Sequence, residues 1–311
     1  MTPAEEPALM SATTVPARRA ALRPAAAVRT GLRTGGMVLL EARPKVLAIG
    51  GIRYLTGALL SGGVVLSSDT LTGLVAWVLV TTSVYVLNGV TDVGPDRVNG
   101  SRRPLASGRL PVRVARAAVA ACAVAAVLLS VVVSWGFALH LVVALLLGVR
   151  YSSGRRPAKA SSAAASVVVV LGGLITYHAG LIAAGGHITV PYLVFSTCLS
   201  LWMGVGAVLK DLTDIDGDRA AARATLAVRY GPAPAAGLAW VAAVLITTAL
   251  VVATTGPHPL AGHLRLPSAA MIAGTVWLGV TCASVALRTR WAYRVFMYTQ
   301  FAAHGSLVPL Y

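Results

Sequence analysis

Acidic residues are scarce in this sequence, and most of them lie in two short segments. The chain has 311 residues and only ten Asp and Glu, of which six fall within residues 92–96 and 211–218. Each segment follows a long apolar stretch, where an unpaired carboxylate is costly. Carboxylates in such positions indicate a functional site, and two groups of them predict one shared metal site.

The first segment carries Asn88, Asp92 and Asp96 at intervals of four residues. On a continuous helix this spacing puts the three side chains on one face, within about 60° of arc. Carboxylate and amide oxygens are hard ligands that suit Mg2+, an ion that keeps positions open for water and phosphate oxygens. The spacing therefore predicts Mg2+ bound together with a diphosphate.

The second segment repeats this arrangement. Asp211, Asp214 and Asp218 follow the i, i+3, i+7 pattern of one helix face, whereas Asp216 points away from it. The predicted metal ligands are Asn88, Asp92, Asp96, Asp211, Asp214 and Asp218. Among them, the predicted catalytic residues are Asp92, Asp96, Asp211 and Asp214.

Basic residues accompany both acidic segments. Those nearby are Arg97, Arg102, Arg103 and Arg109 in the first case, and Lys210, Arg219 and Arg223 in the second. Taken singly, each is equally well explained as a residue of a cytoplasmic loop, where Lys and Arg accumulate. Beside the carboxylates, they complement the charge of a bound diphosphate.

The elements that must position these residues are apolar helices. The chain is 57% hydrophobic and 12% charged, whereas soluble domains are about 25% charged. We therefore predict an all-α membrane protein with nine transmembrane helices. The predicted spans are 46–66, 71–90, 115–134, 135–149, 164–183, 191–210, 235–253, 268–287 and 291–310.

The distribution of basic residues tests this topology independently. If the N-terminus and every second loop are cytoplasmic, the cytoplasmic segments hold 24 of the 26 Lys and Arg residues. This distribution predicts a cytoplasmic N-terminus. It also explains the net charge of +16, together with attraction to the lipid bilayer, and no nucleic-acid partner is expected because no basic patch is interleaved with aromatic residues.

The ends of the chain suggest two regions. Residues 1–36 are rich in Ala, Pro, Thr and Arg without an apolar signal core, so we predict a disordered cytoplasmic tail followed by a transmembrane domain over 37–311. Arg outnumbers Lys by 23 to 3, which indicates a GC-rich coding sequence. The expected location is therefore a bacterial cell membrane, with the site opening to the cytoplasmic side.

Both acidic segments resemble the signatures of a known family. Residues 88–96 followed by Arg-Pro-Leu-Ala-Ser-Gly at 103–108 are similar to the first signature of the UbiA-type intramembrane prenyltransferases. Residues 210–219, running on to 225–231, resemble the second signature, particularly that of the homogentisate and chlorophyll branches. The resemblance covers about residues 40–310.

The resemblance implies an activity and a cofactor. Members of the family use Mg2+, as two ions, to transfer a prenyl chain from an allylic prenyl diphosphate to an acceptor, and diphosphate is released. The expected acceptor here is aromatic, or at least small and lipophilic. Arg43-Pro44, and Tyr151-Ser152 with Lys159, are weaker similarities to the same family pattern. The residues expected to bind diphosphate are Arg103, Lys159, Lys210 and Arg53.

Loss of diphosphate would leave a carbocation in a central apolar chamber that both acidic motifs face. The aromatic residues expected to stabilise this cation or the prenyl chain are Tyr85, Tyr177 and Trp202. Aromatic residues at helical spacing more often serve packing. Arg53 lies well inside a predicted span that is otherwise apolar, and it either binds a diphosphate or an acceptor carboxylate, or snorkels to the membrane surface.

Two residues depart from the family pattern. Gly89 stands where the family often has Asp, which removes one possible ligand. Pro95 lies between Asp92 and Asp96, and proline disfavours helix at the preceding residue. We therefore expect Asp96 to lie on a broken turn.

Two other functions fit parts of the pattern. A terpene cyclase of the same family would use the same metal chemistry without an acceptor, and the aspartates alone do not separate it from a transferase. A transporter would explain intramembrane carboxylates and similar halves. It would not explain the Arg-Pro-Leu sequence at 103–105.

Overall fold

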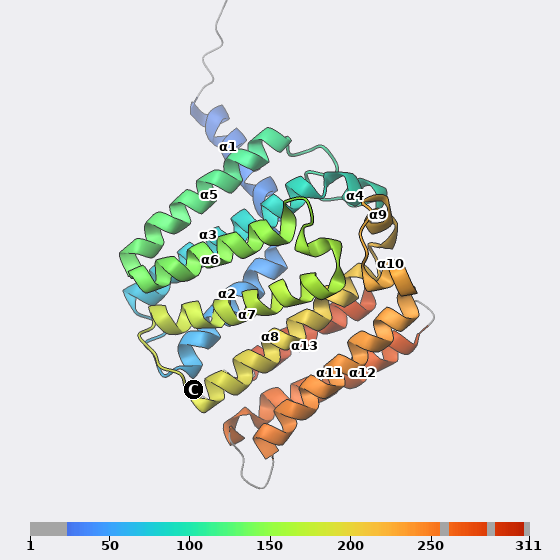
Figure 1. Ribbon diagram of the computed structural model, residues 1–311. Helices are drawn as coiled ribbons and strands as arrows, with labels where there is room; N and C mark the ends of the chain where they lie inside the picture. The colour runs from blue at the N-terminus through green and yellow to red at the C-terminus, as the bar shows by residue number, and fades with distance from the viewer. Residues whose placement is uncertain (1–23, 256–260, 285–289, 308–311) are drawn as a thin grey trace, which may run out of the picture.

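The computed structural model describes residues 24–255, 261–284 and 290–307, and side chains from residue 31 onward. Within these described residues, nine helices form the bundle (Figure 1). They are α2 (Pro44–Leu60), α3 (Ser68–Thr91), α5 (Val112–Val133), α6 (Trp135–Ser152), α7 (Ser162–Ala183), α8 (Val190–Asp211), α11 (Pro232–Thr255), α12 (Arg265–Ala283) and α13 (Trp291–Gly305). The remaining elements are α1 (Pro24–Glu41), α4 (Val93–Val98), α9 (Ile215–Ala220), α10 (Leu226–Tyr230) and the 3-10 turns η1 (Ala158–Ala160) and η2 (Gly262–Leu264).

The prediction of an all-α membrane protein is confirmed. Seven helical segments of the described chain are long and apolar enough to cross a membrane. A helix also lies at the other two predicted spans, but α2 has 17 residues and α13 has 15. Their lengths of about 26 and 22 Å fall short of the roughly 30 Å hydrocarbon core. Nine crossings and a cytoplasmic N-terminus therefore stay predictions.

Helix α2 lies inside the bundle. It contacts α3, α7, α8 and α13, so most of its surface faces other helices rather than lipid. Helices α2 and α7 cross closely because each places a glycine against the backbone of the other. A Cβ at Gly57 of α2 would overlap the carbonyl of Tyr177, and a Cβ at Gly180 of α7 would overlap the carbonyl of Tyr54. This crossing joins the start of the bundle to its middle.

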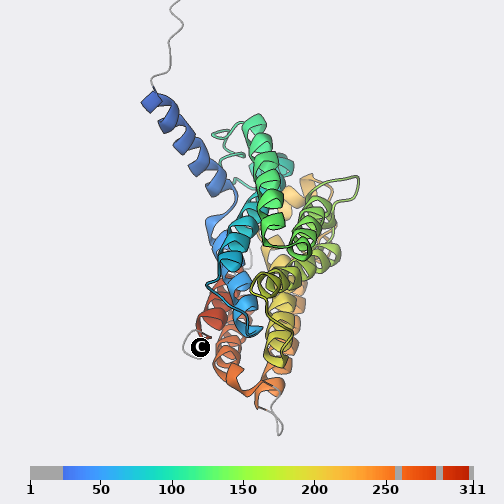
Figure 2. The same cartoon turned by 90° about the vertical axis from the view of Figure 1, so that its left-hand side faces the viewer.

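Helix α1 differs from the predicted tail. Residues 24–36, which the sequence analysis assigned to the tail, form part of this helix, and residues 1–23 lie outside the described residues. Figure 2 shows α1 extending away from the bundle. The chain then turns sharply into α2 at Arg43, whose φ of 62° lies in the left-handed region that non-glycine residues seldom adopt.

Neither acidic segment is one continuous helix. A break near Asp96 was predicted from Pro95 for the first segment, whereas the second segment was predicted to be one helix face. Helix α3 ends at Thr91, Asp92 leaves helical geometry with φ −105°, and α4 begins at Val93. Pro95 accounts for the position of this break, because it lacks an N–H and its ring would clash with the carbonyl four residues earlier. The break therefore falls at Asp92, and Asp96 lies within α4.

The second acidic segment breaks in the same way. Asp214 has φ −106° and precedes α9, much as Asp92 precedes α4. Here the hydroxyl of Thr213 donates to the carbonyl of Lys210 at 3.2 Å, a local bond that competes with continuation of the helix. The two halves of the chain thus present matching helix–break–short helix units.

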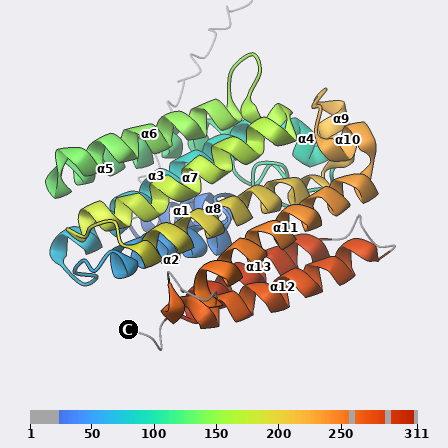
Figure 3. The same ribbon diagram turned by 60° about the horizontal axis from the view of Figure 1, so that its bottom comes forward.

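The two short helices meet at the same end of the bundle (Figure 3). Asn99, at the end of α4, accepts a hydrogen bond from the backbone N–H of Gly217 at 2.7 Å and donates to the carbonyl of Asp214 at 3.4 Å. This contact brings the acidic segments together although 118 residues separate Asn99 from Gly217.

Candidate active site

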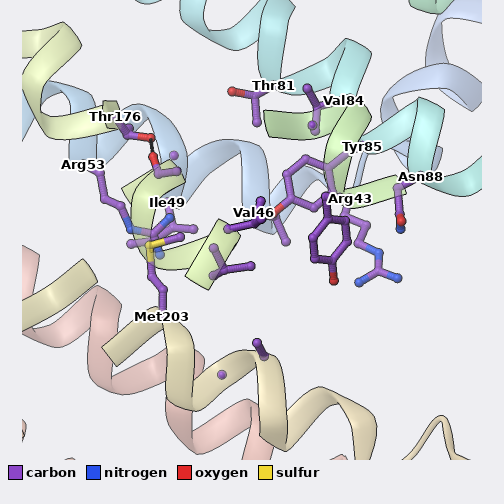
Figure 4. Close-up of a pocket in the computed structure, with 18 of the residues that line it drawn as sticks. Arg43, Val46, Ile49, Arg53, Thr81, Val84, Tyr85, Asn88, Thr176 and Met203 are labelled. Atoms are coloured by element: carbon purple, nitrogen blue, oxygen red, sulfur yellow. Dashed lines mark hydrogen bonds between the residues drawn. The ribbon is translucent and has the colours of Figure 1, made fainter. Parts of the chain in front are cut away.

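An apolar chamber of about 220 Å3 lies between α2, α3, α6, α7, α8 and α13. Figure 4 shows Arg53 and Met203 toward one end of its lining and Arg43 and Asn88 toward the other. Most other lining side chains are aliphatic or aromatic, as a site for a hydrocarbon chain requires. A polar basin of about 890 Å3 adjoins the chamber, because Arg43, Lys210 and Tyr293 line both.

Two predicted ligands line the polar basin itself. Asp96 pairs with Arg103 at 2.9 Å, and Asp214 pairs with Lys210 at 2.9 Å. Burial favours a higher pKa for Asp214, but Lys210 outweighs it and holds that pKa below its ordinary value. The carboxylate of Asp214 is therefore ionised at neutral pH.

Asp92 lies behind the basin in a buried cluster of polar groups. The Lys159 ammonium donates to Asp92 at 2.8 Å, to the hydroxyl of Thr91 at 2.5 Å and to the side-chain oxygen of Asn88 at 3.3 Å. Burial opposes ionisation of Asp92, but Lys159 and Arg223 outweigh it and lower the pKa of its carboxyl.

Arg223 joins the two acidic segments. One of its guanidinium nitrogens donates to Asp92, and another donates to Asp218 at 2.9 Å. Burial raises the pKa of Asp218 more than Lys210 and Arg223 lower it. The second carboxylate oxygen of Asp218 is buried without a hydrogen-bond partner. This oxygen is therefore available to bind a cation.

The remaining members of the second segment differ from one another. Asp211 accepts a hydrogen bond from Ser162 at 2.9 Å, and Ser162 in turn accepts one from the N–H of Leu226 at 2.9 Å. Asp216 has a side chain that is 61% exposed and lies near Arg219. Asp216 thus points away from the other carboxylates, as its position in the sequence predicts.

The donor set fits Mg2+ by its chemistry. Carboxylate oxygens from both segments and the amide oxygen of Asn88 are the hard ligands that this ion prefers, and Asp218 retains the unpartnered oxygen. Within the described residues, however, no three His, Cys, Asp or Glu side chains lie close enough to form a metal-binding group. Instead, Lys159, Arg223 and Lys210 lie among the carboxylates and neutralise them.

Glu41 is a buried carboxylate that the sequence analysis missed. It is fully buried at the end of α1, pairs with Arg103 at 2.6 Å and accepts the backbone N–H of Leu105 at 3.0 Å. A Cβ at Gly89 would overlap an oxygen of Glu41. The space beside Gly89, where the family often has Asp, is therefore taken by the carboxylate of Glu41.

Of the three predicted aromatic residues, only Tyr85 lines the chamber. Tyr177 is fully buried with its hydroxyl 2.7 Å from the Nε2 of His304. Trp202 is also fully buried, and its indole N–H donates to the carbonyl of Phe296 at 3.4 Å. The positions of Tyr177 and Trp202 thus do not support a direct contact with a cation, because both pack between helices.

Several residues of the site were not among those predicted. Arg43 and Tyr293 line both cavities, and Gln300 of α13 accepts a hydrogen bond from Arg53. The only sequence signal was Arg43 directly before Pro44, at the start of a span. Nothing in the spacing of Tyr293 or Gln300 distinguishes them from packing residues.

Comparison with known proteins decides the family. The model of the UbiA prenyltransferase family matches residues 52–303. The chain belongs to this family. The chain is also similar in fold to a UbiA homolog from Archaeoglobus fulgidus bound to GPP and Mg2+, with a TM-score of 0.69, 17% identity, and coverage of 88% of this chain and 99% of that one.

Two curated members of the family show the range of sequence relatives. A digeranylgeranylglyceryl phosphate synthase of Sulfolobus acidocaldarius is 28% identical over 183 residues, 58% of this chain and 62% of that one. Homogentisate phytyltransferase 1 of Arabidopsis thaliana is 25% identical over 260 residues, 78% of this chain and 65% of that one. Both matches span less than two thirds of the relative's length.

Proposed function

We propose that the protein transfers a prenyl chain from an allylic prenyl diphosphate to an acceptor. One observation carries the proposal: two acidic segments, fastened together through Asn99, meet beside an apolar chamber. The solved relative bound to GPP and Mg2+ and the two curated prenyl-transferring relatives support it. The acceptor is proposed to be aromatic, as for the homogentisate enzyme.

The proposed cofactor is Mg2+, as two ions held by Asp92 and Asp96 of one segment and Asp214 and Asp218 of the other, with Asn88 and Asp211 close by. Bound Mg2+ stabilises the negative charge of the departing diphosphate. Lys210, Arg43 and Arg103 add positive charge at the basin. Lys159 is proposed to keep Asp92 ionised rather than to bind diphosphate itself, because it is buried against that carboxylate.

In the reaction, the bond between the prenyl C1 and the diphosphate oxygen breaks, and its electron pair stays on the diphosphate. The acceptor forms a new bond to C1 and loses a proton, which the released diphosphate takes up. The apolar chamber excludes water that would otherwise capture the cation. Tyr85 offers a ring in the chamber for cation–π stabilisation, worth about 2 kcal/mol when desolvated.

The proposed topology has nine crossings over residues 37–311, with a cytoplasmic N-terminus. Helices α2 and α13 would count among the crossings, since both lie against other helices and need not span the lipid alone. The clustering of basic residues in alternate loops supports this orientation. It gives a site that opens to the cytoplasmic side of a bacterial cell membrane.

The test is diphosphate release by purified protein with geranyl, farnesyl and geranylgeranyl diphosphates, with and without homogentisate. We expect release that requires Mg2+ or Mn2+ and stops in excess EDTA, because all the proposed ligands are hard oxygens. Turnover that persists in chelator would refute the metal site. Release of a cyclic product without acceptor would show a cyclase instead of a transferase.

A further inference from the structure

Arg53 is a cation deep in the bundle without an ionic partner among the described residues. Its side chain is on α2, is 5% exposed and lines the apolar chamber. It donates to the side-chain oxygen of Gln300, and the hydroxyl of Tyr177 lies nearby, so both polar neighbours are uncharged. Its Nε is buried without a hydrogen-bond partner. A buried guanidinium with an unused donor requires an anion.

The charge of the chamber lining leads to the same requirement. Three cations line it, namely Arg43, Arg53 and Lys210, and no Asp or Glu of the described chain does. Arg43 and Lys210 also line the polar basin, where Asp96 and Asp214 lie. Two of the three cations thus face the end where a diphosphate would bind, and Arg53 does not line the basin.

Arg53 lies too deep to serve the same phosphate group. It follows Arg43 by ten residues, which is about 15 Å along a helix. Figure 4 shows it at the opposite end of the lining from Arg43 and Asn88. This position argues against the sequence-based prediction that Arg53 binds diphosphate. The hydrocarbon chain of a prenyl donor has no hydrogen-bond acceptor or negative charge for a guanidinium.

We infer that Arg53 and Gln300 form a subsite for an anionic group of the acceptor. The inference rests on the proposed transfer function and names the acceptor's class: an oxyanion, either a carboxylate or a phosphate ester, joined to the part that receives the prenyl group. With its anion at Arg53, the acceptor would extend past Tyr85 toward the diphosphate end. The planar guanidinium suits both oxyanions.

The test measures binding rather than turnover, so it does not depend on the reaction. Dissociation constants are determined by calorimetry for the detergent-solubilised full-length protein, in buffer freed of metals by chelating resin and without donor. The carboxylate probe is 4-hydroxyphenylacetate, compared with its neutral methyl ester. The phosphate probe is benzyl phosphate, compared with neutral benzyl dimethyl phosphate. The pair with the larger preference identifies the source of the anion.

We expect wild type to bind at least one anion at least about tenfold more tightly than its neutral counterpart. Arg53→Gln should lose this preference while its affinity for the neutral probe stays the same, which shows that the chamber remains folded. Arg53→Lys should keep part of the preference, because the charge remains without the planar fork. Lys210→Gln, at the basin end, is the matched control and should keep it.

Three results would overturn the subsite. The first is that wild type shows no preference for either anion. The second is that Arg53→Gln retains the preference. The third is that Lys210→Gln abolishes the preference, which would show that the anion binds at the basin. If diphosphate is not released but the anion preference persists, the proposed transfer function fails and the subsite does not. Loss of the preference with intact diphosphate release would refute the subsite alone.

Discussion

At the scale of single residues, the site is a network of opposite charges in which most carboxylates contact a cationic side chain. Lys159 and Arg223 contact Asp92, Arg223 also contacts Asp218, and Lys210 contacts Asp214. Such pairing lowers the cost of burying charge. It also means that a divalent ion and a diphosphate can enter together, since the diphosphate supplies new partners for the displaced side chains.

Replacing a carboxylate of this network that is a proposed metal ligand should sharply reduce catalysis. We expect Asp92→Asn and Asp218→Asn each to reduce kcat/KM by at least about 100-fold, or ~2.7 kcal/mol of transition-state stabilisation. Asp216→Asn is the matched control in the same segment and should stay within about threefold of wild type, because its side chain is exposed. Equal losses in Asp216→Asn and Asp218→Asn would show that the assignment of ligands is wrong.

Glu41 should act through Arg103. Removing one member of a buried ion pair costs about 3–5 kcal/mol because the other charge is left uncompensated. We expect Glu41→Gln to lower the midpoint of thermal unfolding, and Arg103→Met to lower it as well. The double variant should lose less than the sum, with a coupling energy of at least about 1 kcal/mol. Strictly additive losses would indicate that the two side chains are independent.

The sequence predicted which acidic segments come together better than it predicted the contacts of single residues. The spacing of Asp92, Asp96, Asp214 and Asp218 indicated oxygen ligands in two sets, and the structure brings the two segments together. It gave no sign that Glu41 would lie against Gly89, because that contact depends on how α1 approaches α3. Long-range pairs of this kind leave no periodic trace in a single sequence.

At the scale of elements, the repeated break before a short helix is the main feature. Helix periodicity predicted the nine long segments, since apolar stretches of that length leave few alternatives. It failed at Asp92 and Asp214, where the same spacing was read as one helix face. Periodicity does not reveal breaks as short as these, one residue at Asp92 and three at 212–214, because the spacing of the acidic residues continues across them.

Close packing of α4 on α9 makes Gly217 a test of this arrangement. A Cβ there would lie 2.6 Å from the carbonyl oxygen of Pro95 and would overlap the side-chain amide of Asn99. We expect Gly217→Ala to separate the short helices, which costs about 1–3 kcal/mol, and to lower kcat/KM by at least about tenfold. The measurements are thermal unfolding and diphosphate release.

Gly94 provides the control for that substitution. It lies in α4, and a Cβ there would meet nothing within 4 Å. Gly94→Ala should therefore keep wild-type turnover, and its unfolding temperature should stay the same or rise, since Ala is the better helix former. If both alanine variants lose activity equally, the contact between α4 and α9 is not what positions the site.

At the scale of the whole molecule, the site is shared between the two halves of the chain, so ligand binding should stabilise the entire bundle. We expect Mg2+ and inorganic diphosphate together to raise the unfolding temperature more than the sum of their separate effects. A ligand at 100 times its Kd contributes about 2.7 kcal/mol. Asp92→Asn should abolish the joint shift, and an undiminished shift in that variant would place the binding elsewhere.

The contacts that complete the site also set an order of events during synthesis. Lys159 follows Asp92 by 67 residues, and Gly217 follows Asn99 by 118. At roughly 5–20 residues per second, the ribosome adds Lys159 about 3–13 s after Asp92, and Gly217 about 6–24 s after Asn99. A nascent chain that ends before Lys159 carries a carboxylate that only water can solvate. Asp92 is therefore expected to stay hydrated until Lys159 has been added, and the contact between α4 and α9 follows later.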